Sequence, residues 1–162
     1  MLQLKPFTPK DFKRLISWLD NEEMMVQVAG PVFSFPLTEE QLINYLADSN
    51  RHAFSVVDAD TDVTIGHAEV YVTAEGTAKI CRVLIGEESS RGKGLGKELI
   101  ILLVKFSVKD IGLSNIELNV YDWNTQAIKC YEQVGFVFNP DRVTTIEVKG
   151  ETWRSLNMVF KS

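Results

Sequence analysis

Apolar side chains recur along this chain with two different periods, and segments of the two kinds are interleaved. Spacings of three and four residues, which put apolar positions on one helix face, run over residues 12–19, 38–48, 95–109 and 125–134. Apolar or alternating stretches typical of strands run over residues 2–7, 53–57, 63–72, 78–85, 116–120, 136–138 and 152–160. The pattern predicts a single α/β domain of mixed sheet over residues 1–162.

Residues at the ends of the predicted helices support these boundaries. Thr8 is followed three residues later by Asp11, and Thr38 three residues later by Gln41. This is the arrangement of a capping box, in which side chains pair with the first N–H groups of a helix. Gly135 stands where the last helix should end, and glycine is the usual residue at that position.

The strands of residues 53–57 and 63–72 flank a turn-rich acidic connector and are predicted to form a hairpin, which residues 78–85 extend to a three-stranded meander. A glycine-rich segment joins this third strand to the longest predicted helix. Its glycines, Gly92, Gly94 and Gly96, let the backbone approach a ligand without a side-chain clash. The first turn of the following helix offers unpaired N–H groups and the positive end of a dipole. Three basic side chains flank the segment: Arg91, Lys93 and Lys97. This combination predicts a site for a phosphate or pyrophosphate group.

Spacing separates the nucleotide sites that use such loops. A P-loop requires Gly-Lys followed by Ser or Thr, whereas Gly96-Lys97 is followed by Glu98. A dinucleotide fingerprint requires Gly-x-Gly-x-x-Gly, a spacing that residues 92–96 lack. The remaining pattern, Arg/Gln-x-x-Gly-x-Gly/Ala, belongs to acyl-CoA pyrophosphate loops and is met by Arg91 and the last two glycines.

A second motif lies downstream of the loop. Asn124, Ala127, Tyr131 and Gly135-Phe136 have the spacing Asn-x-x-Ala-x-x-x-Tyr-x-x-x-Gly-Phe. With both motifs in this order, the chain resembles the GCN5-related N-acetyltransferases, the GNAT family. Three N-terminal features are similar to the branch that acetylates ribosomal proteins and to its small-molecule relatives: Trp18, Gly30-Pro31 and Pro36-Leu37-Thr38.

The resemblance, which covers nearly the whole chain, implies the GNAT fold. That fold is one domain with a mixed, mostly antiparallel seven-stranded sheet, whose fourth and fifth strands splay apart, and about four flanking helices. One departure concerns the connector of residues 86–90, which is about one residue longer than is common in the family and lacks its proline. The register of the fourth strand against the cofactor is therefore open by one residue.

The resemblance further implies acetyl-CoA as co-substrate and a role for each matching residue. The pantetheine arm would pair with the fourth strand at Val83, Leu84 and Ile85, and Asn124 would help to fix it. Backbone amides of the loop would hold the pyrophosphate: Arg91, Gly92, Lys93, Gly94, Leu95 and Gly96. An amine would attack the thioester directly, and Tyr131, protonated at neutral pH, would donate a proton to the leaving thiolate.

The attacking amine must also lose a proton. Glu69, which shares a strand face with His67 and Tyr71, is the predicted base, acting directly or through water. Arg82, a charge inside an otherwise apolar strand, either orients an acidic part of the acceptor or pairs with Glu69 across the strands. The alternative role of Tyr131 is packing on the apolar stripe of its helix. The alternative for Glu69 is a strand position that faces solvent.

Composition narrows the classes of partner. Seventeen basic and 22 acidic residues give a formal net charge of -5, whereas nucleic-acid binders usually carry a basic field. The longest apolar run, residues 99–104, is too short to span a membrane, and the first residues lack a signal-peptide pattern. The cytoplasm is therefore the expected location. Cys81 and Cys130 give neither a disulfide framework nor a metal-ligand pattern, so no metal is expected.

Three functions are compatible with these features. The leading hypothesis is an acetyl-CoA-dependent N-acetyltransferase acting on a small-molecule amine or a protein N-terminal amine, with assembly into a homodimer left open. The second is a non-catalytic acyl-CoA-binding sensor or interaction module. The third is a nucleotide-binding domain that uses the loop for ATP or NAD. Stabilisation of the fold by acetyl-CoA, and not by ATP or NAD, would separate the third from the others.

Overall fold

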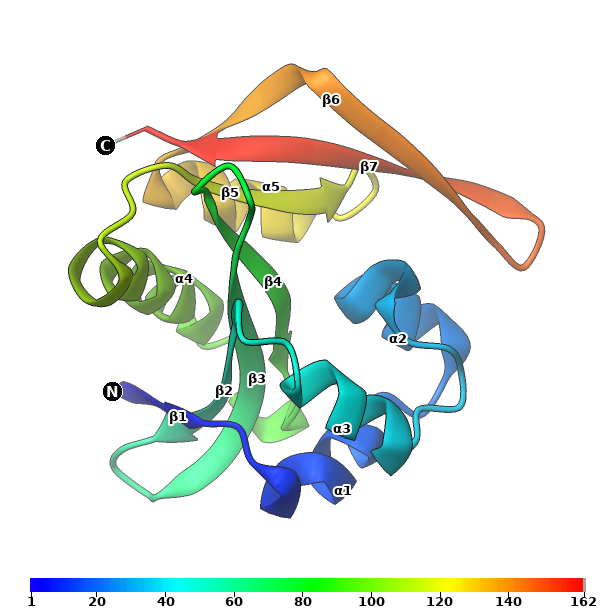
Figure 1. Cartoon of the computed structure of the whole chain (residues 1–162), viewed down its shortest axis with the longest axis vertical. Helices are drawn as coiled ribbons and strands as arrows, with labels where there is room; N and C mark the ends of the chain where they lie inside the picture. Colours follow the sequence, from blue (N-terminus) through cyan, green and yellow to red (C-terminus); the bar gives the residue numbers. More distant parts are fainter. Residues whose placement is uncertain (162) are drawn as a thin grey trace. The chain divides into compact units, whose positions relative to one another are not determined.

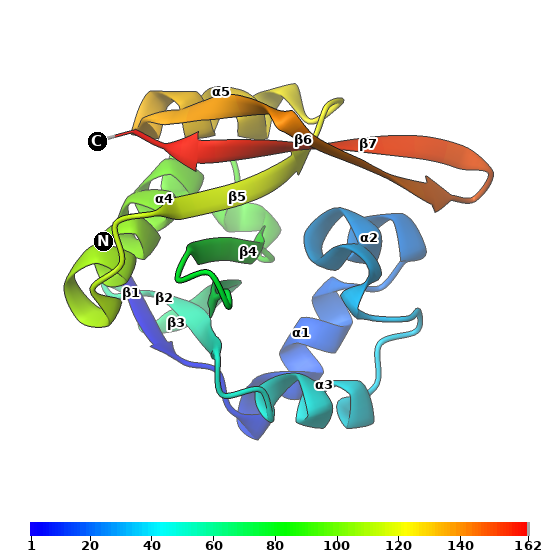
Figure 2. The same cartoon turned by 45° about the horizontal axis from the view of Figure 1, so that its top comes forward.

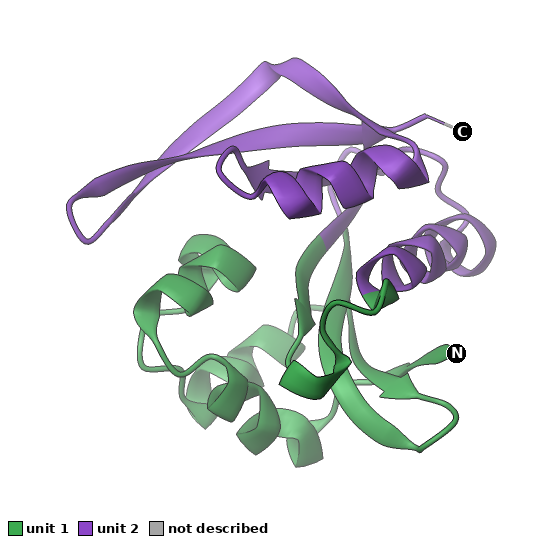
Figure 3. Cartoon of the chain, turned by 180° about the vertical axis from the view of Figure 1, so that it is seen from behind, with its two compact units in different colours: residues 1–71, 81–95 green, residues 72–80, 96–162 purple. Residues whose placement is uncertain are grey.

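The computed structural model describes residues 1–161 and confirms the α/β class. Seven strands form a mixed sheet in the order β1-β2-β3-β4-β5-β7-β6. The chain divides into two compact units (Figure 3), of which unit 1 comprises residues 1–71 and 81–95. Unit 2 comprises residues 72–80 and the chain from residue 96 onward. The chain passes from unit 2 into unit 1 between residues 80 and 81.

The sheet of unit 1 is an antiparallel meander that confirms the predicted hairpin. Its strands are β1 (Leu2–Pro6), β2 (Arg51–Asp58) and β3 (Val63–Val72), and β2 pairs with both neighbours. A β-bulge at Val56/Val57 interrupts the register of β2 with β3. β1 lies at one edge of the sheet order.

Three helices of unit 1 pack apolar side chains together. They are α1 (Phe12–Trp18), α2 (Glu22–Ala29) and α3 (Glu39–Leu46). Thr38 caps α3 as predicted, because its hydroxyl accepts a hydrogen bond from the Gln41 N–H at 3.3 Å. The helix α2 was not predicted, although Asn21 caps it by accepting from the Met24 N–H at 2.8 Å.

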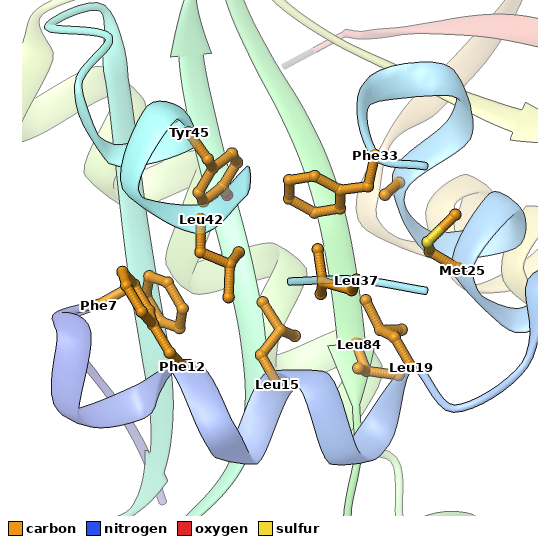
Figure 4. Close-up of a cluster of buried hydrophobic side chains, with 11 residues drawn as sticks. Phe7, Phe12, Leu15, Leu19, Met25, Phe33, Leu37, Leu42, Tyr45 and Leu84 are labelled. Atoms are coloured by element: carbon orange, nitrogen blue, oxygen red, sulfur yellow. The ribbon is translucent and has the colours of Figure 1, made fainter. Parts of the chain in front are cut away.

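Buried side chains from these helices, from the chain around them and from β4 form one apolar cluster in unit 1. In Figure 4 the labelled side chains converge from α1, α3 and the neighbouring segments. The cluster comprises Phe7, Phe12, Leu15, Leu19, Met25, Ala29, Phe33, Leu37, Leu42, Tyr45 and Leu84. Burial of this much aliphatic and aromatic surface fixes the helices on their face of the sheet.

Unit 2 contains the parallel strand pair and the two remaining helices. The strand β4 (Ala78–Ile85) pairs in parallel with β5 (Ile116–Tyr121) over Ala78–Ile80. The helix α4 (Leu95–Phe106) continues as a π turn at Ser107–Ile111 and ends at Gly112, whose φ is 82°. The helix α5 (Thr125–Val134) has the predicted bounds and runs alongside β6 and β7 (Figure 2).

The last two strands form a hairpin much longer than expected (Figure 1, orange and red). They are β6 (Phe136–Val148) and β7 (Glu151–Phe160), and β7 also pairs with β5 in antiparallel orientation. The predicted sixth strand ended near Phe138. A register shift between Asn139 and Val143 lets the polar residues there bulge out of β6 while the pairing with β7 continues.

Candidate active site

The glycine-rich segment forms an open turn ahead of α4. Gly92 and Gly94 both have φ of 74°, a left-handed conformation that side-chain-bearing residues rarely adopt. Among the described residues, no atom of another segment lies within 4 Å of the Cβ positions built on Gly92, Gly94 or Gly96. Lys93 and Lys97 are exposed beside this turn. The backbone of the segment is therefore accessible, at the helix end that favours anions.

Arg91 is exposed, and its side chain also holds the connector. Its guanidinium donates to the carbonyl oxygens of Ile85 at 3.0 Å and of Gly86 at 3.3 Å. Its backbone N–H donates to the Glu88 carbonyl at 3.1 Å. Both the amide and the side chain of Arg91 thus have partners inside the connector, which gives this residue an anchoring role at the start of the loop.

Trp18 fixes the other side of the same connector. A Cβ on Gly86 would lie 2.0 Å from the indole Cδ2 of Trp18, so only glycine allows this approach. The indole N–H donates to the Glu87 carboxylate at 3.4 Å. The Gly86 N–H donates to the Ile65 carbonyl of β3 at 2.8 Å. The connector that is unusually long for the family is therefore held by α1 and β3.

The backbone of β4 indicates which of its residues can pair with a ligand. A Cβ on Gly66 of β3 would lie 2.3 Å from the Leu84 carbonyl oxygen, so that carbonyl faces β3. Backbone polar groups of successive strand residues point to opposite sides. The N–H and C=O groups of Val83 and Ile85 consequently face away from β3, and the Ile85 carbonyl already accepts from Arg91. Of these two residues, Val83 is the one whose carbonyl is not the acceptor of the Arg91 side chain.

Asn124 and Tyr131 both belong to α5 in unit 2. Asn124 is the N-cap of α5, and its side-chain oxygen accepts a hydrogen bond from the Ala127 N–H at 3.3 Å. Tyr131 is half-buried, with its ring centroid 6.3 Å from that of Phe136. Within residues 1–161 no hydrogen bond to the Tyr131 hydroxyl is found, and burial raises its pKa to about 12. The hydroxyl therefore stays protonated at neutral pH and is available as a donor.

Glu69, the predicted base, lies at the centre of a buried polar cluster in unit 1. Its side chain is 0% exposed and accepts hydrogen bonds from Arg51 Nε at 3.0 Å and Arg82 Nε at 2.9 Å. The Tyr45 hydroxyl also donates to it. The predicted pairing of Arg82 with Glu69 is confirmed. No motif pointed to Tyr45 or Arg51, since neither belongs to the two family segments.

Tyr45 also determines the protonation state of His67. The single Tyr45 hydroxyl proton is donated to Glu69, so the contact of 3.1 Å between Tyr45 O and His67 Nε2 requires an N–H on His67 Nε2. Burial, and to a lesser extent the Arg82 charge, lower the pKa of His67 to about 3. His67 is therefore a neutral donor, and its Nδ1 atom is buried without a partner among residues 1–161.

Electrostatics keep the rest of the cluster in fixed charge states. Burial raises the pKa of the Tyr45 hydroxyl, and the Glu69 charge raises it further, so Tyr45 remains neutral. Burial alone would lower the pKa of Arg82, but the combined effects of Glu69, Cys81 and Tyr45 outweigh burial, and the pKa is raised. One carboxylate thus serves two guanidinium groups, and losing it would strand buried charge at a cost of about 3–5 kcal/mol.

Arg82 has an unusual backbone for a strand residue. Its φ is 51°, in the left-handed region, which for a residue with a side chain costs roughly 1–2 kcal/mol. It stands two residues after Ile80, where the parallel pairing of β4 with β5 ends. The side chain of Arg82 is only 13% exposed. A strained conformation of this kind persists only where the surrounding structure restrains it.

The structure groups the predicted site residues in two sets. Glu69, Val83–Ile85 and the loop up to Leu95 belong to unit 1, while Gly96, Asn124 and Tyr131 belong to unit 2. No group of three or more His, Cys, Asp or Glu side chains placed to hold a metal ion occurs in the described part of the chain. Over residues 1–161, none of the helices has the length and apolar character needed to cross a bilayer.

Comparison with known proteins identifies the family. Residues 14–136 match the acetyltransferase (GNAT) family. The human alpha/beta-tubulin-N-acetyltransferase 9 is 27% identical over 150 residues, covering 82% of this chain and 70% of that protein. The mouse protein of the same name is 23% identical over 145 residues; the match covers 82% of this chain but only 60% of the mouse protein's length. The aminoglycoside N(6')-acetyltransferase type 1 of Klebsiella pneumoniae is 28% identical over 155 residues, covering 82% of this chain and 72% of that protein.

A solved structure confirms the fold. The spermidine N-acetyltransferase from Vibrio cholerae, in complex with CoA and spermine, superposes with a TM-score of 0.83 at 23% identity, covering 98% of this chain and 94% of that one. The chain therefore belongs to the acetyltransferase (GNAT) family, as its loop and its Asn-to-Phe motif predict. Acetyl-CoA-dependent N-acyl transfer is the class of enzyme activity that this family defines.

Proposed function

We propose that this protein transfers an acetyl group from acetyl-CoA to a primary amine, without a covalent enzyme intermediate. The observation that carries the proposal is the turn before α4. Two glycines with φ of 74°, open space at three glycine positions and two exposed lysines together suit a pyrophosphate. No side-chain nucleophile is needed for the reaction, because the acceptor amine is itself the nucleophile.

Each part of acetyl-CoA has a proposed binding residue. The amides of Gly92, Lys93, Gly94, Leu95 and Gly96 bind the pyrophosphate, and Arg91 anchors the loop through the connector. The pantetheine arm pairs with β4, principally at Val83, because the Leu84 backbone faces β3. The side-chain oxygen of Asn124 caps α5, so its NH₂ group is the part that contacts the arm.

The proposed chemical step forms one bond and breaks another. The amine nitrogen attacks the thioester carbonyl carbon, a C–N bond forms, the C–S bond breaks, and CoA leaves as a thiolate. Tyr131 donates to that sulfur. Its pKa of about 12 is higher than that of an ordinary thiol, near 8.5, so a hydrogen bond to the developing thiolate precedes any full proton transfer. Tyr131 thus acts as a donor to the leaving group.

Proton removal from the acceptor is proposed to use water. Glu69 is fully buried, and Tyr45, Arg51 and Arg82 already donate to its carboxylate. A base needs hydrogen-bond contact with the proton that it removes. Solvent water at the amine meets that requirement, with Glu69 acting at most at a distance. The expected acceptor is a primary amine of a small molecule or of a protein N-terminus, met in the cytoplasm.

Release of free thiol from acetyl-CoA in the presence of an amine panel tests the function. The panel should contain a polyamine, an aminoglycoside and a peptide with a free N-terminus, because named relatives act on such compounds or on tubulin. Turnover that depends on both acetyl-CoA and one amine class is the expected result. Mass spectrometry of the product should show one added acetyl group.

The alternative is a non-catalytic acyl-CoA-binding module. It predicts that acetyl-CoA raises the unfolding temperature, that no amine is acetylated, and that Tyr131→Phe changes neither result. The available Tyr131 hydroxyl favours the enzyme, since a binding module needs no donor at that position. Absence of both CoA binding and turnover would reject the two functions together.

A further inference from the structure

Glu69 makes contacts that a base does not need. Its carboxylate is 0% exposed and accepts hydrogen bonds from three elements: Tyr45 of α3, Arg51 of β2 and Arg82 of β4. A catalytic base must contact the acceptor or an adjacent water molecule. The partners of Glu69 are instead protein groups, and one of them, Arg82, is a residue of the strand that is proposed to bind acetyl-CoA.

Arg82 occupies a decisive position in β4. Its left-handed backbone, with φ of 51°, follows the last parallel pair of β4 and β5 at Ile80 and directly precedes Val83. The φ angle of Arg82 therefore sets the direction in which Val83–Ile85 continue. A residue with a side chain does not favour this conformation by itself. Contacts of the guanidinium with Glu69 at 2.9 Å supply the restraint.

We propose that Glu69 is a positioning residue for the acetyl-CoA site, an inference that rests on the function proposed above. By binding the Arg82 guanidinium, Glu69 holds Arg82 in its left-handed conformation and so fixes the backbone of Val83–Ile85. Arg51 and Tyr45 fix the Glu69 carboxylate in turn, from β2 and α3. The buried ion-pair cluster thereby aligns the strand residues that bind the pantetheine arm.

The charges of the cluster explain why one carboxylate has this effect. Arg51 and Arg82 are both largely buried, with side chains 11% and 13% exposed, and both bind Glu69. Without the carboxylate the two guanidinium groups repel each other. Arg82 would then turn toward solvent, and its backbone would relax to the ordinary strand conformation. Acetyl-CoA would bind only the fraction of molecules that keep the original conformation.

Two substitutions of Arg82 test the central step. Arg82→Gly and Arg82→Ala both remove the guanidinium, and they differ only in the Cβ atom. Glycine adopts positive φ freely, whereas alanine does not. We expect Arg82→Gly to bind CoA roughly tenfold more tightly than Arg82→Ala, measured by calorimetry. Equal affinities for the two variants would overturn the proposal, because the backbone of Arg82 would then not matter.

Glu69→Gln distinguishes a positioning residue from a base. We expect KM for acetyl-CoA to rise on the order of tenfold, with an unchanged shape of the pH profile of kcat/KM. The double variant Glu69→Gln/Arg82→Gly should regain CoA affinity, because glycine needs no restraint. A base would instead lose one limb of the pH profile and show no recovery in the double variant. Glu40→Gln, an exposed change on α3, is the matched control.

Controls keep the inference separable from the proposed function. Circular dichroism and thermal unfolding establish whether each variant is folded, and if Glu69→Gln does not fold, the Arg82 pair decides. Wild-type protein that binds no CoA would reject the proposed function itself. Wild-type protein that binds CoA, with Glu69→Gln binding equally well and losing a limb of the pH profile, would reject only the positioning role.

Discussion

At the residue scale, Tyr131 combines a free hydroxyl with a raised pKa. Burial raises that pKa to about 12, so the hydroxyl keeps its proton at neutral and moderately alkaline pH. We expect Tyr131→Phe to lower kcat by about 100-fold, the lower end for loss of a proton donor, with little change in KM for acetyl-CoA. Steady-state kinetics measure both constants. Tyr71→Phe, which loses a hydrogen bond to Asp48, is the control tyrosine.

The raised pKa of Tyr131 also predicts how activity depends on pH. Activity should rise between about pH 7 and pH 10 as the acceptor ammonium, with an ordinary pKa near 10.4, loses its proton. Tyr131 should add no falling limb below pH 10, since its pKa is about 12. A falling limb near pH 9 that disappears in Tyr131→Phe would contradict this assignment.

His67 gives a second prediction, this one for stability. Its folded-state pKa is about 3, against an ordinary value of 6.5, chiefly because it is buried. The unfolded state therefore binds the proton more readily, and the free energy of unfolding falls as pH drops below 6.5 toward 3. The slope contributed by this residue approaches ~1.4 kcal/mol per pH unit.

Urea unfolding at several values between pH 4.5 and 6.5 measures that slope, in a window above the ordinary pKa of most carboxyl groups. His67→Gln keeps a donor for Tyr45 and removes the titrating group. We expect the variant to show a flatter dependence on pH, whatever its stability at neutral pH. Parallel curves for wild type and variant would show that another group governs acid unfolding.

At the scale of elements, the loop before α4 depends on backbone conformation more than on side chains. Gly94 has φ of 74° with open space around it, so Gly94→Ala adds strain of roughly 1–2 kcal/mol without a clash. We expect about a tenfold rise in KM for acetyl-CoA. Gly112→Ala is a matched control, with φ of 82° and equally open space at the end of the π turn that follows α4. It should lower the unfolding temperature and leave KM unchanged.

Element boundaries show what local patterns can predict. The helix α5 and the strand β4 were predicted at their observed bounds, because caps and apolar periodicity agree there. The helix α2 was missed, although Asn21, acidic residues in the first turn and Gly30 mark its ends. Most of its residues, Glu, Met, Gln and Ala, are good helix formers, so these signals were sufficient to predict the helix. The length of β6 was missed because residues 139–142 interrupt its strand pattern, although the β-branched residues of 143–148 are typical of a strand.

At the scale of the whole molecule, only part of the candidate site could be predicted from the sequence, and the reason is physical. The loop and Asn124 could be proposed from the sequence because the chemistry expected of them depends on backbone geometry, which sequence spacing records, and their roles stay predictions. The partners of Glu69 were missed, apart from Arg82, because Tyr45 and Arg51 reach it from separate elements. Such contacts depend on tertiary packing. The Arg82 backbone conformation also has no sequence signature, since arginine ordinarily avoids it.

Net charge is the remaining property of the whole chain, and it bears on how an acceptor is captured. A formal charge of -5 attracts cationic amines over distances comparable to the Debye length, about 10 Å at 0.1 M salt and 3 Å at 1 M. We expect kcat/KM for a triamine to fall more steeply with added salt than kcat/KM for a monoamine of the same length. The attraction scales with acceptor charge, whereas chemistry at the thioester does not. Initial rates at low acceptor concentration, with saturating acetyl-CoA, isolate this effect from CoA binding. Equal slopes for the two amines would mean that contacts inside the site, and not the field of the protein, select the acceptor.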